Sequence, residues 1–139
     1  MFRFSLFFTA VVLCLFSACE SNTASKNEFV ISGKAEGVFN GVRVYLKTSE
    51  NGQKGRITDT AIVVNEAFNF KGKIDGSEMR ILTIDGIVGQ TALVLEPEQI
   101  EVTIYKDSIY QSEVSGGNNN VIFNSYKNGY QALLSLIHI

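Results

Sequence analysis

Short apolar runs with a period of two residues restrict the fold of this chain more than any other feature. In residues 42–47 the apolar side chains of Val42, Val44 and Leu46 alternate with other types, and residues 100–105 repeat the pattern. Successive side chains of a strand point to opposite faces, so this alternation is typical of half-buried β-strands. We predict eight strands, at residues 29–35, 42–47, 57–64, 67–74, 79–84, 90–95, 100–105 and 112–115.

Gly, Asn and Asp residues cluster between these segments, and no helical pattern separates them. Parallel neighbours usually need a crossover helix, so we expect antiparallel pairing throughout. The predicted fold is an all-β domain over residues 29–117, an antiparallel β-sandwich or barrel-like structure. Phe68 and Phe70 share one strand face and are expected in its core.

The N-terminus has the layout of a secretory signal peptide. Arg3 supplies a positive charge, residues 6–16 are apolar except for one Thr, and the small residues Ser17 and Ala18 directly precede Cys19. The apolar run is shorter than the roughly 20 residues of a membrane-spanning helix. An ordinary cleaved signal and an uncleaved anchor are alternative interpretations of the same run.

The segment Phe16-Ser17-Ala18-Cys19 resembles the lipobox of bacterial lipoproteins, although Phe16 stands where that family most often has Leu. The resemblance implies that a signal peptidase recognises Phe16, Ser17 and Ala18 and removes residues 1–18. It also implies that Cys19 carries a diacylglycerol group on sulfur and an acyl group on its new amine. Two or more acyl chains give stable anchoring to a membrane.

Residues 19–28 are polar and lack aromatic side chains, which predicts a flexible tether between the lipid and the domain. Only Glu20 is acidic directly after the Cys. This favours a lipid-anchored protein of the bacterial cell envelope that faces the periplasm rather than the cell surface. The net charge of −2 becomes −3 when Arg3 leaves, which does not favour nucleic-acid binding.

The predicted mature domain offers little material for catalysis. Its only Cys would be the lipidated Cys19, and the single His of the chain is His138. Asp75 and Asp85 each precede Gly and are expected in turns, whereas Glu96, beside Pro97, is expected in solvent together with Glu98. We therefore expect no catalytic residue, no cofactor and no metal site, and the chain as given is not expected to be an enzyme.

The C-terminal part changes character after Gly117. Residues 118–133 have helical spacing after three Asn residues that can cap a helix, so we predict the start of a helical linker in a truncated chain. Residues 134–139 spell what one reading frame of a common sequencing-library transposon end encodes. We interpret them as adapter read-through; a natural apolar helix end is the alternative.

Several strand segments occur in the order found in a known family. They are Phe29-Val30-Ile31-Ser32-Gly33-Lys34, Val44-Tyr45-Leu46, Asp59-Thr60, Phe68-Asn69-Phe70-Lys71-Gly72, Leu95-Glu96-Pro97 and Val114-Ser115-Gly116. Over residues 29–130 the chain resembles the N-terminal domain of unknown function of periplasmic thiol-disulfide interchange lipoproteins of the AhpC/TSA, TlpA- and ResA-like type. One departure is Glu66-Ala67, where the family tends to have Gly before Phe, which makes a tight hairpin with positive φ less expected there.

The resemblance implies a non-catalytic accessory domain, held at the membrane by lipid. It places the redox chemistry in a downstream thioredoxin-like domain in cis, with a CxxC motif that this chain lacks. It supplies no catalytic residue for this part. The alternative is a standalone periplasmic lipoprotein that binds a peptide or glycan, which an exposed aromatic cluster among Tyr45, Tyr105 and Tyr110 would favour. An enzyme would need titratable groups that converge in one pocket.

Overall fold

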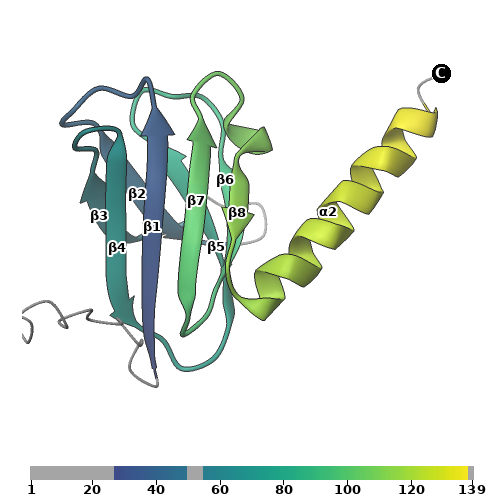
Figure 1. Ribbon diagram of the computed structural model, residues 1–139, viewed down its shortest axis with the longest axis horizontal. Coiled ribbons are helices and arrows are strands. Elements are labelled where there is room, and N and C mark those ends of the chain that lie inside the picture. Colours follow the sequence, from purple (N-terminus) through teal and green to yellow (C-terminus); the bar gives the residue numbers. More distant parts are fainter. Residues whose placement is uncertain (1–26, 50–54, 138–139) are drawn as a thin grey trace, which may run out of the picture.

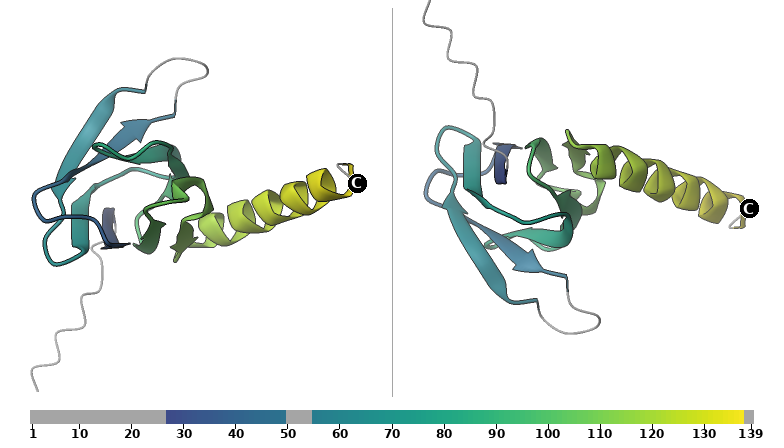
Figure 2. Two further views of the ribbon diagram at one scale, coloured as in Figure 1. Left: turned by 90° about the horizontal axis from the view of Figure 1, so that it is seen from above. Right: turned by 90° about the horizontal axis from the view of Figure 1, so that it is seen from below.

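The computed structural model describes residues 27–49 and 55–137, which form two four-stranded β-sheets and one long helix (Figure 1). Their elements are β1 (Glu28–Glu36), β2 (Arg43–Thr48), β3 (Ile57–Ile62), β4 (Ala67–Lys73), β5 (Glu78–Ile84), β6 (Thr91–Leu95), β7 (Gln99–Tyr105), the 3-10 turn η2 (Ile109–Gln111), β8 (Glu113–Ser115) and α2 (Asn118–Ile137). Sheet A has the order β4-β1-β7-β8, and sheet B has the order β3-β2-β5-β6. The two sheets lie as layers, with α2 projecting from one side (Figure 2).

The alternation of side chains places one apolar layer between the sheets. In β1, Ile31 and Ala35 are fully buried, and in β7 the side chains of Ile100, Val102 and Ile104 are at most 1% exposed. Each such side chain contributes about 1.5–3 kcal/mol on burial, which is the main stabilising contribution in a domain of this size. The predicted strands and their mostly β fold are therefore confirmed, and Phe68 and Phe70 lie in the core as expected.

The prediction that all strands pair antiparallel is wrong for one pair. β1 and β7 run parallel, with Ile31 opposite Ile100 and Ala35 opposite Ile104. No crossover helix joins them, because the chain between them builds β4 beside β1 and all four strands of sheet B. The connection from β1 to β7 thus consists of β4 and the four strands of sheet B, where parallel strands usually have a crossover helix. The other pairs within the two sheets are antiparallel.

The ladder between β1 and β4 contains two pairs of Gly and Phe. Gly33 lies opposite Phe68, and Gly72 lies opposite Phe29. A Cβ on Gly33 would come within 2.0 Å of the Phe68 ring, and one on Gly72 within 2.8 Å of the Phe29 ring. Each ring therefore lies over the backbone of the glycine on the neighbouring strand.

A tight turn joins β3 to β4, although the expected Gly is absent there. Asn65 and Glu66 both have positive φ, 51° and 59°, and the residues on either side form an isolated bridge. Asn tolerates this conformation, whereas Glu adopts it at a cost of about 1–2 kcal/mol. The Glu66 carboxylate accepts a hydrogen bond of 2.8 Å from the Gly37 N–H, and the Asn65 N–H donates to Asn40 Oδ1. These long-range contacts offset the strain of the turn.

The helix α2 is longer than the segment that its sequence pattern predicted. It begins at Asn118 as expected but continues to Ile137, beyond the predicted limit at residue 133. It touches the sandwich near its N-terminal end and then leads away from it (Figure 1). Residues 134–137 are therefore helical. Their interpretation as adapter read-through stays a prediction.

Candidate functional site

The residues predicted to be recognised and lipidated lie outside the described residues. Phe16, Ser17, Ala18 and Cys19 all precede residue 27, so cleavage and lipidation stay predictions. Within residues 27–49 and 55–137, no helix is long and apolar enough to cross a membrane.

A polar joint attaches α2 to the edge of sheet B. The Glu96 carboxylate accepts hydrogen bonds from the Asn119 N–H at 3.1 Å and from Asn119 Nδ2 at 3.0 Å, and the same Nδ2 donates to Ser77 Oγ at 2.9 Å. Glu96 is only 5% exposed, so the expectation of a solvated side chain is wrong. The carboxylate can be buried because it faces the positive N-terminal end of the helix, where backbone donors are free.

Asn120 completes this joint by replacing a strand neighbour. Its Oδ1 accepts from the Val94 N–H and its Nδ2 donates to the Val94 carbonyl, both at 2.8 Å, while Nδ2 also donates to the Gly116 carbonyl. The side chain is 1% exposed. It therefore pairs both the N–H and the carbonyl of Val94, which point outward from β6 at the edge of sheet B. These buried backbone groups would otherwise lack partners.

One turn further along α2, Asn124 reaches the other sheet. Its Nδ2 donates to the Val114 carbonyl of β8 at 2.6 Å. Asn120 and Asn124 thus bond the edge strands of sheets B and A from the same side of the helix. Gly117 lets the helix begin this close, since a Cβ there would lie 2.1 Å from Glu96 Oε1. We call Glu96, Asn119, Asn120 and Asn124 the α2 joint.

Beyond the joint, α2 carries an apolar stripe on the side opposite the sandwich. Ile122, Tyr126, Tyr130 and Leu133 follow helical spacing and are 67%, 71%, 53% and 57% exposed. The rings of Tyr126 and Tyr130 stack with centroids 6.4 Å apart. In an ordinary surface helix such a stripe faces the core. Here the joint directs polar side chains toward the sandwich and leaves the apolar stripe exposed.

A groove lies between α2 and sheet A, and we call it the helix–sheet groove. Glu101, Thr103 and Glu113 line it from β7 and β8, while Lys127 and Gln131 line it from the helix, around a volume of about 470 Å³. That volume falls in the range of small-ligand pockets, roughly 300–1,000 Å³.

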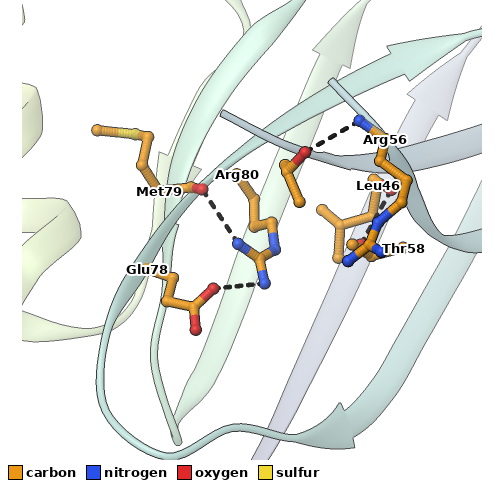
Figure 3. Close-up of polar contacts among 7 residues, drawn as sticks. Leu46, Arg56, Thr58, Glu78, Met79 and Arg80 are labelled. Atoms are coloured by element: carbon orange, nitrogen blue, oxygen red, sulfur yellow. Dashed lines mark hydrogen bonds and ion pairs between the residues drawn. The ribbon is translucent and has the colours of Figure 1, made fainter. Parts of the chain in front are cut away.

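A second groove opens between the sheets at the end where β1 begins, and we call it the Arg80 groove. Its volume is about 390 Å³, and Phe29, Leu46 and Leu95 contribute its apolar lining. Arg80 Nη2 forms an ion pair of 2.6 Å with Glu78 Oε2, and Nη1 donates to the Met79 carbonyl (Figure 3). These contacts fix the guanidinium group at the groove wall.

The Arg80 side chain is only 15% exposed, and its Nε–H is buried without an acceptor in the described part of the chain. An unsatisfied buried donor costs about 1–3 kcal/mol. On the neighbouring strands, Thr58 Oγ1 donates to the Leu46 carbonyl and the Arg56 N–H donates to the hydroxyl of Thr48 (Figure 3). Both partners of Arg80, Glu78 and Met79, belong to β5 itself, so these contacts hold the guanidinium group along its own strand.

The three tyrosines considered for an aromatic cluster do not share one face. Tyr45 lies on β2 in sheet B, near the ammonium group of Lys47, whose Nζ is 5.7 Å from the ring centroid. Tyr105 ends β7 in sheet A, and Tyr110 follows in η2. A hydrogen bond with Glu113 raises the pKa of Tyr105 above its ordinary value of 10.0, with smaller contributions from desolvation and charge repulsion. The Tyr105 N–H also donates at 3.1 Å to Oγ of Ser112, a residue that lines the helix–sheet groove.

Among the residues described by the structure, no group of three or more His, Cys, Asp or Glu side chains could hold a metal ion. Asp75, expected in a turn, precedes Gly76 with φ of 99° and accepts a hydrogen bond from Asn27 Nδ2. The α2 joint is the buried polar constellation that sequence reasoning missed.

A family model described as a domain of unknown function (DUF4369) matches residues 29–123, which covers both sheets and the first turns of α2. No curated protein matches the chain.

Proposed function

Because this chain belongs to the DUF4369 family of domains of unknown function, we propose that it is a non-catalytic, lipid-anchored accessory domain of the bacterial cell envelope. In this proposal the sandwich holds a downstream thioredoxin-like thiol-disulfide interchange domain at a set position relative to the membrane. Cys19 attaches the N-terminal end to lipid, residues 19–28 form the tether, and α2 leads to the redox domain.

The observation that carries this proposal is the α2 joint. Four polar side chains fix the start of α2 to both sheets, so the helix leaves the sandwich in one direction rather than as a free linker. The chain enters β1 at the end of the sandwich where α2 begins, and the helix runs toward the level of the opposite end (Figure 1). The predicted linker residues 118–133 all lie in α2 and span about 24 Å as a helix, which is a useful spacer length.

Metabolic labelling with a fatty-acid analogue tests the lipid anchor. The wild-type precursor is expected to take up label and to shorten by 18 residues, whereas Cys19→Ala should do neither. Cys14→Ala is the matched control, because it removes the other Cys of the chain and should be labelled normally. Undiminished labelling of Cys19→Ala would refute the anchor.

The genomic sequence downstream of codon 133 tests the accessory role. We expect an open reading frame that continues from α2 into a thioredoxin-like segment with a CxxC motif. A natural stop codon at that point would contradict the accessory function. A standalone binding lipoprotein would then be the better account, and the helix–sheet groove is the observation that favours it.

A further inference from the structure

The two walls of the helix–sheet groove belong to sheet A and to α2, and the α2 joint fixes the position of one relative to the other. β7 and β8 supply one wall, and the part of α2 that directly follows the joint supplies the other. The bond of 2.6 Å between Asn124 and the Val114 carbonyl joins two lining residues, one from each wall. A ligand would therefore meet a preformed site rather than order a mobile one, which lowers the entropic cost of binding.

The orientation of α2 keeps this groove open. Lys127 and Gln131 face the sheet, while Ile122, Tyr126 and Tyr130 face away from it. Had the apolar stripe faced the sheet, it would have packed against it and filled the space. Long polar side chains instead leave an open cleft whose walls carry hydrogen-bonding groups.

The chemistry of the walls selects the class of ligand. Glu101 and Glu113 offer carboxylate acceptors, Lys127 offers donors, and Gln131 and Thr103 can both donate and accept. Two carboxylates and one ammonium group do not favour an anion such as a phosphate ester. A peptide strand has no continuous edge to pair with, because β8 is three residues long and its Val114 carbonyl is already bonded.

Tyr105 adds a flat apolar surface beside these polar groups. It is 42% exposed and follows Glu101 and Thr103 on the outward face of β7, and its N–H donates at 3.1 Å to Oγ of Ser112, which lines the groove. Alternating hydroxyl and C–H surfaces are the chemistry of a sugar ring, which needs mixed donors and acceptors together with an aromatic face. We propose that the helix–sheet groove binds a neutral glycan chain, with Glu101, Glu113 and Gln131 bonding its hydroxyl groups and Tyr105 packing against one ring.

A titration with a β-1,4-linked tetramer of N-acetylglucosamine tests this site. The full ¹⁵N-labelled chain is kept in a detergent without a sugar headgroup, and amide shifts are followed by NMR. Saturable shifts are expected at β7, β8 and residues 124–131 of α2. Tyr105→Ala should weaken binding at least about tenfold, and Gln131→Trp, an exposed position, should block the groove.

Tyr45→Ala is the matched control, because it removes a tyrosine from the outer face of the other sheet and should leave the affinity unchanged. Thermal unfolding of each variant separates loss of binding from loss of fold. Absence of saturable shifts at up to 20 mM tetramer, or equal effects of the two Tyr→Ala changes, would overturn the proposal. Binding of an unstructured acidic or basic peptide at the same residues, in place of the tetramer, would overturn it too. None of these outcomes depends on lipidation of Cys19 or on a downstream domain.

Discussion

Substitution of Gly33 by Ala should destabilise the sandwich although it adds a single methyl group. Gly33 lies in β1 opposite Phe68, and an ideal Cβ there would be 2.0–2.3 Å from three ring carbons of Phe68. Unstrained carbon contacts are about 3.5–4.0 Å, so the ring would have to move by roughly 1.5 Å. It has no free space to move into, because Phe68 is 1% exposed and packs edge to face on Phe70.

The size of the effect follows from two opposed contributions. Overpacking of a dense core typically costs about 1–3 kcal/mol, and a ring held on all sides places this site near the upper value. Ala loses less chain entropy than Gly on folding, which returns about 0.5–1 kcal/mol. We expect Gly33→Ala to lower the free energy of unfolding by about 2 kcal/mol, equivalent to a fall in Tm of roughly 8–16 °C.

Urea unfolding followed by far-UV circular dichroism measures this loss, and a double-mutant cycle tests its cause. Phe68→Leu shortens the group that the new methyl would touch, so the double variant should be more stable than the sum of the single effects by at least about 1 kcal/mol. Gly72→Ala is the graded comparison, because its Cβ would lie 2.8 Å from the Phe29 ring and should cost less. Additivity of the Gly33 and Phe68 changes within about 0.3 kcal/mol would refute the steric explanation.

Three further predictions concern the core, the joint and the groove. Phe70→Ala should cost about 3–5 kcal/mol in urea unfolding, because the ring is 2% exposed, and a loss below about 1 kcal/mol would contradict its burial. Asn120→Ala should cost about 2–3 kcal/mol by leaving two edge groups of β6 unpaired, while the exposed Asn128→Ala should change the same urea measurement by under about 0.5 kcal/mol. Glu113→Ala should lower the pKa of Tyr105 toward its ordinary value in a ¹³C NMR titration, since the raised pKa depends first on that hydrogen bond. The stability linked to the raised pKa is present below about pH 10 and is lost as the pH rises through the folded-state pKa, so an unchanged titration in the variant would contradict this assignment.

The period-two pattern predicted most of the fold because it reports burial directly. Val44 and Leu46 are buried on one face of β2, and every predicted strand exists with limits shifted by two residues or fewer. The same pattern carries no information about which strand lies next to which. Ile31 is buried whether its neighbour runs parallel or antiparallel, so the parallel pairing of β1 and β7 could not follow from it.

The candidate sites were less predictable because their partners are distant in sequence. Glu96 looks like a solvated residue beside Pro97, and its burial depends on the donors of Asn119, 23 residues later. Glu66 looks like a poor turn residue, yet a bond to the Gly37 N–H, 29 residues earlier, holds it there. The one local signal for the joint was the run of three Asn after two Gly, which predicted the helix start but not what it would contact.

The joint also explains why the exposed stripe and the open groove occur together. The side chains of Asn120 and Asn124 hydrogen bond to strand backbone, so the helix would lose these bonds if it rotated about its axis to bury its apolar side. Rotation by half a turn would break both bonds and leave Val94 and Val114 with unpaired edge groups, at roughly 1–3 kcal/mol for each buried group. Burial of Tyr126 and Leu133 would return a similar amount for each side chain. The hydrogen bonds of the joint thus favour the observed orientation by a free energy comparable to that gained by burial of the apolar stripe. A partner that covers the stripe would favour the orientation in which the groove stays open.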